Sequence, residues 1–577
     1  MNVSTQQKVG GLKAWSERWT RQLRQREDQV FLILTLLIGA LVGLVVVAFI
    51  LLTERLGERL YPVGGAAWRR ILVPIMGTLA TGYLLYRYFP DARGSGVPQT
   101  KAALYAREGR ITLGTVLGKF FCTSATLASG IPLGREGPAV QVGAGISSVL
   151  GRSLGLSQEK VKSLLPVGAA AAIAAAFNTP LAAVLFSLEE VMGDLHAPVL
   201  GSVVLASTTS WIVLRLLLGN EPLFHVPQYE LVHPLEFAIY GVLGLVGGLI
   251  SVAFTKLLLG LRQRFLRMPE RTRWFQPVAG GLLVGLLGWL VPQVLGVGYG
   301  HVGEALNGKM ALQLMALLVF LKLFAVTVSY ASGNAGGIFG PSLFIGAMLG
   351  GTVGRVAHGL LPAYTGTPGA YALVGMGTVF AGIVRAPMTS VVMIFEVTRD
   401  YTIIVPLMIS NLVSLFISAK LQRQPIYEAL AIQDGIHLPR PEVQRYSGRP
   451  VAAVMRAPRE ILPAQTTVLE ALHRVQAGEF HSWPVVDERG VIGVVSAAAL
   501  QKALDDSAGA RKLAELISTE MFPHVHSDQL LHVALERMGA AGLDTLPVVS
   551  RANVHQLEGI VVLSDILDSY GVSHHDT

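Results

Sequence analysis

Long runs of apolar residues occupy most of the chain before residue 430 and predict membrane-spanning helices. Val30–Thr53 is an uncharged run long enough to cross a bilayer as a helix. Comparable runs follow at Ile71–Leu85, Pro198–Leu214, Phe237–Phe254, Pro277–Val297, Leu312–Tyr330 and Thr402–Ala419. Glycine and proline shorten or interrupt several of them, and broken helices persist at membrane depth only where protein or a polar cavity surrounds their backbone. The pattern predicts an all-α polytopic membrane domain.

After Leu430 the pattern changes to that of a soluble domain. Asp434–Pro450 is polar and rich in proline, which is typical of a linker. Beyond it lies an apolar helical stripe followed by two valine-rich strand candidates; the stripe consists of Val468, Ala471, Leu472 and Val475. Trp483-Pro484-Val485-Val486 recurs as Leu546-Pro547-Val548-Val549. We therefore expect a separate α/β domain built from two copies of one unit.

The composition of the chain agrees with a membrane protein. Of its 577 residues 51% are hydrophobic and 15% are charged, and the mean hydropathy is +0.51, which excludes an ordinary soluble domain. The net charge of +8 needs no nucleic-acid partner, because basic loops facing a cytoplasmic leaflet explain it. Basic residues outnumber acidic ones in residues 1–29, so the positive-inside rule predicts a cytoplasmic N-terminus.

Residue types that hold metals or form disulfides are sparse. The single cysteine, Cys122, excludes an intramolecular disulfide and a thiolate metal cluster. Four histidines near the C-terminus lack clear ligand spacing, and we interpret them as solvent-facing; they are His524, His526, His574 and His575. The sequence predicts no metal site.

A charged pentapeptide, Gly134-Arg135-Glu136-Gly137-Pro138, interrupts the apolar sequence where a helix is expected to begin. An ionisable residue in a membrane segment is costly, so Glu136 is a functional candidate. Unpaired amide N–H groups and the positive end of the macrodipole favour an anion at a helix start. The Glu136 carboxylate could fill that position or be displaced from it by another anion.

The pattern of the pentapeptide is repeated at Gly337-Ile338-Phe339-Gly340-Pro341. The register continues beyond both motifs, because Pro180 and Pro387 each precede a glutamate nine positions later, Glu189 and Glu396. A duplicated membrane unit with broken helices is typical of transporters whose substrate lies at the interface of the repeats. Because Glu189 recurs as Glu396, we expect it to have a scaffolding role.

A third break is Gly94-Ser95-Gly96-Val97-Pro98. Its glycines allow close backbone approach, and Ser95 offers a hydroxyl donor. Such a motif by itself indicates only a turn. Its occurrence on the same membrane chain as two further proline-marked helix starts favours a functional role.

These three motifs, in this order, resemble the anion-pathway signatures of the CLC chloride channel and antiporter family, and Tyr427 resembles the pathway tyrosine of that family. The resemblance covers about Val30–Leu430. It implies a homodimer in which each subunit has its own anion pathway within an inverted repeat of tilted and broken helices. It also implies hydroxyl donors from Ser95 and Tyr427, backbone amides from Ile338 and Phe339, and a gate at Glu136.

The same resemblance bears on the transport mechanism. Glu190, in Ser187-Leu188-Glu189-Glu190, matches the family's internal proton-transfer glutamate, which implies chloride/proton antiport; alternatively, it is a helix-end charge facing water. Serine at position 95 implies a preference for chloride. Arg135 and Gly137 would lie at the pathway mouth, where Arg135 is either a structural cation or a group that raises the local anion potential.

The C-terminal region resembles a tandem pair of CBS domains. We predict a cytoplasmic segment at 1–29, a CLC-type membrane domain at 30–430, a linker at 431–450 and CBS domains at 451–504 and 513–572. The nucleotide signature of CBS domains needs a Ser or Thr three residues before an Asp, whereas Ser496 precedes Ala499 and Asp565 follows Val562. This departure favours a structural or dimerising module over an adenine-nucleotide sensor.

Several lysines lie in or near the apolar runs. Lys119 is expected to pair within the protein, as buried lysines must. Lys256, Lys322 and Lys420 lie within or at the ends of apolar segments. We expect them to bury their stems and extend their amines toward water.

Other function classes fit the sequence less well. A passive chloride channel is the main alternative, and a CBS-containing cation transporter is a remote one, because a cation pathway would need acidic or carbonyl rings. Hydrolase motifs such as His-Glu-x-x-His and Gly-x-Ser-x-Gly are absent from the sequence. The sequence thus predicts a plasma-membrane transporter rather than an enzyme, with no catalytic residues or cofactor and with both termini cytoplasmic. Its partners would be chloride, protons, a second copy of the chain and lipid.

Overall fold

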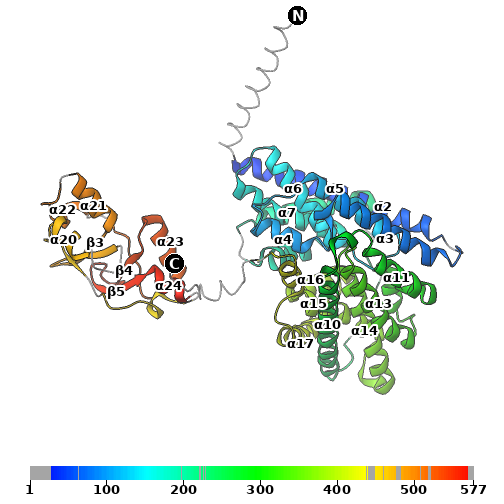
Figure 1. Cartoon of the computed structure of the whole chain (residues 1–577). Coiled ribbons are helices and arrows are strands. Elements are labelled where there is room, and N and C mark those ends of the chain that lie inside the picture. The colour runs from blue at the N-terminus through cyan, green and yellow to red at the C-terminus, as the bar shows by residue number, and fades with distance from the viewer. Residues whose placement is uncertain are drawn as a thin grey trace, which may run out of the picture. The chain divides into compact units, whose positions relative to one another are not determined.

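The computed structural model describes residues 27–569 except 63, 196–197, 220–222, 225, 228, 230, 437, 439–448, 459–460, 476–481, 507 and 518–521. The chain divides into two compact units, Met1–Leu438 and Pro439–Thr577. Most of the predicted N-terminal segment 1–29, together with His574 and His575, lies outside the described residues. The first unit is helical, and small sheets occur in the second (Figure 1).

The first half of the membrane unit consists of helices that begin or end at the predicted breaks. They are α2 (Glu27–Leu60), α3 (Arg69–Arg87), α4 (Val97–Tyr105), α5 (Leu113–Ala128), α6 (Glu136–Ser153), α7 (Gln158–Phe177), α8 (Pro180–Phe186), the π-helical turn η2 (Ser187–Met192) and α9 (Leu200–Leu218). The three motifs predicted to start helices do so, because α4 and α6 begin within the first two and α14 within the third.

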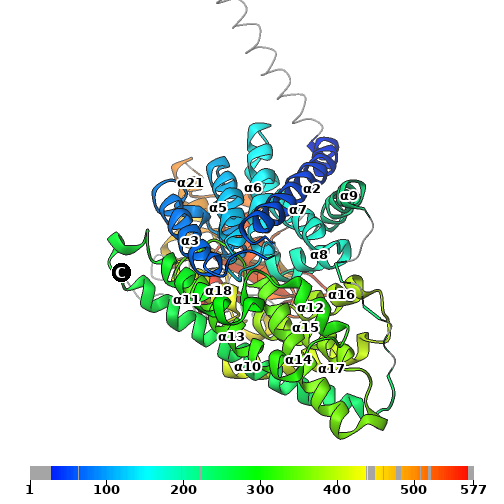
Figure 2. The same cartoon turned by 90° about the vertical axis from the view of Figure 1, so that its right-hand side faces the viewer.

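The second half begins with the long helix α10. Its helices are α10 (Glu236–Leu266), α11 (Pro277–Leu290), α12 (Tyr299–Leu306), α13 (Leu312–Ala331), α14 (Phe339–Leu360), α15 (Pro368–Val384), α16 (Pro387–Thr398), α17 (Ile404–Leu421) and α18 (Ile426–Gln433). In Figures 1 and 2 the blue-to-cyan helices of the first half form one group, and the green helices of the second half lie against it.

Among the described residues, seven helices are long and apolar enough to cross a membrane. Two of these, α7 and α14, were not among the predicted spans. The run Pro277–Val297 was predicted as one segment, but α11 ends at Leu290. Pro292 explains this, because proline disfavours helical backbone at the preceding residue and removes an N–H donor.

Backbone-to-backbone packing joins successive helices in both halves. A side chain at Gly143 in α6 would collide with the carbonyl of Gly168 in α7. The same relation holds between Gly346 in α14 and Gly375 in α15. Small residues at these crossings let apolar helices approach closely, which is how helices associate without a hydrophobic driving force in lipid.

Two glutamates connect the halves by capping helices reciprocally. Glu189 accepts the N–H groups of Met388 at 3.2 Å and Thr389 at 2.8 Å, at the start of α16. Glu396, at the end of that helix, accepts those of Leu181 at 2.9 Å and Ala182 at 2.7 Å, at the start of α8. A carboxylate at a helix N-terminus satisfies orphan donors and opposes the macrodipole. The scaffolding role predicted for Glu189 is confirmed.

Two buried lysines hold loop carbonyls at equivalent places in the halves. Lys119 donates to the carbonyl of Gly94 at 2.8 Å, just before α4. Lys322 donates to the carbonyls of Gly296 at 2.6 Å and Val294 at 3.0 Å, just before α12. Both lysines are fully buried, so the prediction that Lys322 reaches water was wrong. Its amine is instead satisfied by backbone groups freed where helices break.

The C-terminal unit contains the predicted repeat of a helix followed by two strands. β1 (Leu462–Pro463) pairs in parallel with β2 (Ser482–Asp487), which pairs antiparallel with β3 (Gly490–Ser496). In the second copy, β4 (Thr545–Val549) pairs antiparallel with β5 (Leu557–Val562). The helices are α20 (Val468–Val475), α21 (Ala497–Asp505), α22 (Leu513–Leu516), α23 (Leu531–Ala541) and α24 (Leu563–Ser569).

Of the four histidines predicted to face solvent, the two that the structure describes are partly covered instead. His524 and His526 are half-buried, and their Nδ1 atoms lie 2.8 Å and 2.9 Å from the backbone carbonyls of Phe522 and Val549. Both rings therefore contribute to the packing of this unit.

Candidate functional site

The three predicted helix starts converge at one place in the membrane unit. Gly134 and Gly337 exchange reciprocal backbone hydrogen bonds, each 2.7 Å long. The amide of Gly336 donates to the carbonyl of Gly94 at 3.3 Å. These contacts between residues about 200 to 240 positions apart bring the starts of α4, α6 and α14 together. The N-terminal ends of broken helices thus meet inside the protein, which favours an anion between them.

The Glu136 side chain reaches the N-terminal end of α14, a helix of the other half. It is the first residue of α6 and is fully buried. Its carboxylate accepts the N–H of Gly340 in the first turn of α14 at 3.2 Å, and it accepts a hydrogen bond from the hydroxyl of Tyr299. The carboxylate therefore lies where a helix start offers its orphan donors to an anion.

Two hydroxyls near this position form no hydrogen bond with the described residues of the chain. Ser95 and Tyr427 are fully buried. Neither hydroxyl oxygen forms a hydrogen bond with another part of the chain that the structure describes. Buried polar groups are almost always satisfied, so such an orphaned pair needs an explanation. A bound anion that accepts both O–H groups would provide one.

The start of α14 adds backbone donors. Within the described residues, the N–H groups of Ile338 and Phe339 have no protein acceptor. The Phe339 ring packs against Phe177, Phe186 and Phe380, with centroids 4.8, 5.5 and 4.3 Å away. This aromatic cluster directs the side chain into the core and leaves only its backbone for a ligand.

Arg135 and Gly137 flank the glutamate with different surroundings. The guanidinium of Arg135 lies 3.1 Å from Glu54 and 5.7 Å from the centroid of the Tyr299 ring. Gly137 leaves room for Ser95, because a Cβ at Gly137 would approach the Ser95 hydroxyl to 2.6 Å. Gly137 thus permits the first two motifs to touch.

Glu190 lies in the π-helical turn η2 and is only 6% exposed. Its Oε1 atom accepts a hydrogen bond from the Lys101 amine at 2.8 Å. The alternative of a helix-end charge facing open water does not fit this burial. π-Helical turns inside helices are frequent at functional sites.

Two residues of this arrangement were not predicted. Tyr299 binds the carboxylate of Glu136, and Lys101 pairs with Glu190. The glycine-rich stretch Gly296-Val297-Gly298-Tyr299-Gly300 could have indicated a fourth break and hence Tyr299. Lys101 follows the first motif within α4, but no local pattern assigns its partner 89 residues away.

Comparison with known proteins agrees with this geometry. The family described as "Voltage gated chloride channel" matches residues 77–419, and the CBS domain family matches residues 451–506 and 513–571. The chain belongs to the CLC family. The resemblance expected from the motifs, including the C-terminal CBS domains, is therefore confirmed.

Relatives within the CLC family carry several names. An H⁺/Cl⁻ exchange transporter ClcA from Vibrio campbellii is 33% identical over 60% of this chain and 76% of its own length. A ClcB-like chloride channel protein from Ralstonia nicotianae is 36% identical over 59% and 81%. The crystal structure of a slow cyanobacterial Cl⁻/H⁺ antiporter aligns with a TM-score of 0.65 and 26% identity, covering 70% of this chain and 97% of that one.

This CLC protein is thus an integral membrane protein of an anion-transport family and is not an enzyme. Its fold is the helical CLC membrane domain followed by a CBS region with small sheets, as the sequence predicted.

Proposed function

We propose that this protein exchanges chloride for protons across the membrane. The observation that carries the proposal is the Glu136 carboxylate at the start of α14, close to the orphaned hydroxyls of Ser95 and Tyr427. When ionised, Glu136 competes with chloride for the same donors, and when protonated it leaves them. Neutral hydroxyl and amide donors can hold a chloride without trapping it.

Proton coupling needs a second titratable group, and Glu190 is the candidate. It is buried and paired with Lys101. A proton would bind Glu190 from the cytoplasm and pass to Glu136 on the other side of the chloride site. The names of the Vibrio and cyanobacterial relatives as proton exchangers support this proposal.

A passive chloride channel is the second candidate function. It is favoured by the Ralstonia relative that is named as a chloride channel protein. The same anion donors would serve both functions, since they bind chloride irrespective of coupling. Only proton movement distinguishes the two.

Flux measurements on purified protein in liposomes test the proposal. An imposed chloride gradient should move chloride and drive protons in the opposite direction. Chloride movement without proton movement would replace antiport with the channel function. The absence of any anion flux would contradict both.

We propose that the protein is a homodimer of the plasma membrane with both termini in the cytoplasm. Large apolar side chains are exposed on the neighbouring helices α8, α9, α16 and α17, including Leu181, Leu216, Met388 and Phe416. An exposed apolar surface of this kind suits a second copy or lipid. Mass measurement in detergent distinguishes the two, because a single-chain mass would contradict the dimer.

We further propose that the CBS region is structural rather than nucleotide-sensing. The Ser496 hydroxyl accepts the N–H of Ala499 at 3.2 Å and caps α21. Asp565 forms an ion pair with Arg456 at 3.2 Å. Each half-signature residue is thus engaged within the protein. Binding of ATP, ADP or AMP that is lost in Asp565→Ala would contradict this assignment.

A further inference from the structure

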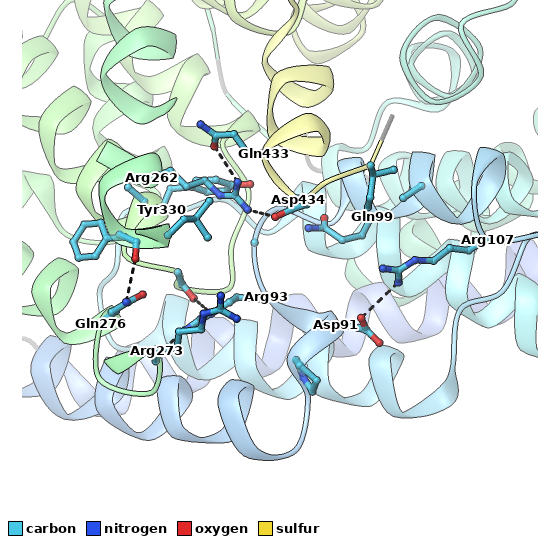
Figure 3. A pocket seen from close by; sticks show the side chains of 18 residues that line it. Asp91, Arg93, Gln99, Arg107, Arg262, Arg273, Gln276, Tyr330, Gln433 and Asp434 are labelled. Atoms are coloured by element: carbon cyan, nitrogen blue, oxygen red, sulfur yellow. Dashed lines mark hydrogen bonds and ion pairs between the residues drawn. The ribbon is translucent and has the colours of Figure 1, made fainter. Parts of the chain in front are cut away.

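A cavity of about 410 Å³ adjoins the anion site. The ends of α10, α13 and α18, the start of α4 and the loops before α4 and α11 surround it (Figure 3). Four arginines line it against two aspartates; these are Arg93, Arg107, Arg262 and Arg273, with Asp91 and Asp434. The lining therefore carries an excess of positive charge.

The arginines are unequally neutralised. Arg107 lies 3.5 Å from Asp91 with both side chains exposed, Arg262 pairs with Asp434, and Arg273 lies 3.0 Å from Glu270, which is outside the lining. Arg93 donates only to backbone carbonyls, those of Gly333 at 3.2 Å and Arg273 at 2.5 Å, and no described carboxylate pairs with it. Burial, together with the charges of Arg273 and Arg262, lowers the pKa of Arg93 to about 10. An anion in the cavity would relieve this repulsion.

The size and chemistry of the cavity select the class of ligand. Its volume lies in the range that holds small organic molecules and far exceeds the size of a chloride ion. Guanidinium groups present planar pairs of N–H donors that match phosphate oxygens. The wall also contains the apolar side chains of Phe265, Leu266 and Ile436, against which an organic group can pack.

We propose that this arginine-lined cavity binds the phosphate group of a phosphate-bearing anion. Its wall includes Gly94 and Tyr330, and the Tyr330 hydroxyl accepts the N–H of Ser95 at 3.3 Å. A bound phosphate therefore lies beside the first anion motif and slows anion transport from that side. This effect on flux rests on the proposed transport function, whereas binding itself does not.

Calorimetry on the full-length protein in detergent, at constant chloride concentration, tests binding with inorganic pyrophosphate as the probe. The double variant Arg107→Gln/Arg273→Gln should bind pyrophosphate at least tenfold more weakly. Arg271→Gln, which removes an exposed charge beside Arg273 but outside the cavity lining, should bind it as the wild type does. No binding by the wild type, or equal binding by the double variant and this control, would overturn the proposal.

The variant Asp91→Asn gives a second test, which can be used even if the double variant Arg107→Gln/Arg273→Gln folds poorly. It removes the exposed partner of Arg107 and should tighten pyrophosphate binding severalfold, while unchanged or weaker binding would count against the site. A short-chain phosphatidylinositol phosphate that binds tenfold more tightly than pyrophosphate, with the same dependence on the variants, would assign the phosphate to a lipid headgroup.

Liposome flux separates binding from its consequence. Pyrophosphate on the cavity's side should slow chloride flux through the wild type and have less effect on the double variant. Pyrophosphate binding without slowed flux would overturn the inhibitory role, but the proposed phosphate-binding site would stand. Failure of the proposed antiport would leave the calorimetric result unchanged.

Discussion

The two halves of the membrane unit share their scaffold and differ in their chemistry. In each half a lysine fifteen residues before the glycine-proline motif holds loop carbonyls, as Lys119 and Lys322 do. In each half a glutamate caps a helix of the other, as Glu189 and Glu396 do. These paired features satisfy the backbone groups that broken helices expose.

The two carboxylates of the described site, Glu136 and Glu190, both come from the first half. Glu136 corresponds in the motif register to Phe339, and Glu190 to Val397. Phe339 packs into an aromatic cluster, whereas Glu136 reaches across to the backbone of α14. Duplication thus supplies two helix starts, and the difference between the copies supplies the two carboxylates.

The largest effect is expected from removing the charge of Glu136, which distinguishes the motif Gly134–Pro138 from Gly337–Pro341. Glu136→Gln should abolish coupled proton movement while chloride still crosses, because the glutamine amide is neither protonated nor deprotonated at physiological pH and so cannot carry the coupled proton. Phe339→Leu is the matched control and should retain coupling. Parallel chloride and proton fluxes in liposomes measure both, and proton coupling that persists in Glu136→Gln would refute its assigned role.

The second effect concerns Glu190, the other acid that has no acidic counterpart in the second half. Glu190→Gln should slow coupled proton transfer on the order of 100-fold, the usual contribution of a positioned acid–base group. Glu189→Gln, its neighbour in the scaffold, should leave the ratio of proton to chloride flux unchanged. Normal proton pumping by Glu190→Gln would move the internal proton step to another residue.

The buried lysines should respond alike if the halves share their scaffold. Lys119→Met and Lys322→Met each leave buried carbonyls without a donor, which costs on the order of 2 kcal/mol of folding stability. Lys256→Met, at an exposed position, is the control. Thermal unfolding in detergent should show similar decreases for the two buried sites, and a loss confined to one half would break the comparison.

The smallest effect is expected from the reciprocal caps. Glu189→Gln and Glu396→Gln each keep one acceptor oxygen but lose the second, at a cost of about 1 kcal/mol. The two melting temperatures should fall by similar amounts, and the double variant should show whether the caps act independently. Opposite effects of the two substitutions would argue against equivalent roles.

Much of the fold could be predicted because its local signals are strong. The motif prolines and glycines indicated the starts of α4, α6 and α14, and the alternating valines indicated the strands of the CBS region. The extent of α11 was overestimated because hydrophobicity alone ignores the break at Pro292. The burial of Lys322 was missed because its acceptors lie 26 and 28 residues away in a loop.

By itself, the sequence determined the helix breaks, the duplicated register and the candidate donors at Ser95, Glu136 and Tyr427. Only the tertiary structure decided which groups bind the buried carboxylates. Glu136 accepts hydrogen bonds from Tyr299 and Gly340, and Glu190 pairs with Lys101. The physical reason is that a break in a helix is a local property of glycine and proline. The satisfaction of a buried charge depends on donors brought from as far as 204 residues away, and no local pattern specifies them.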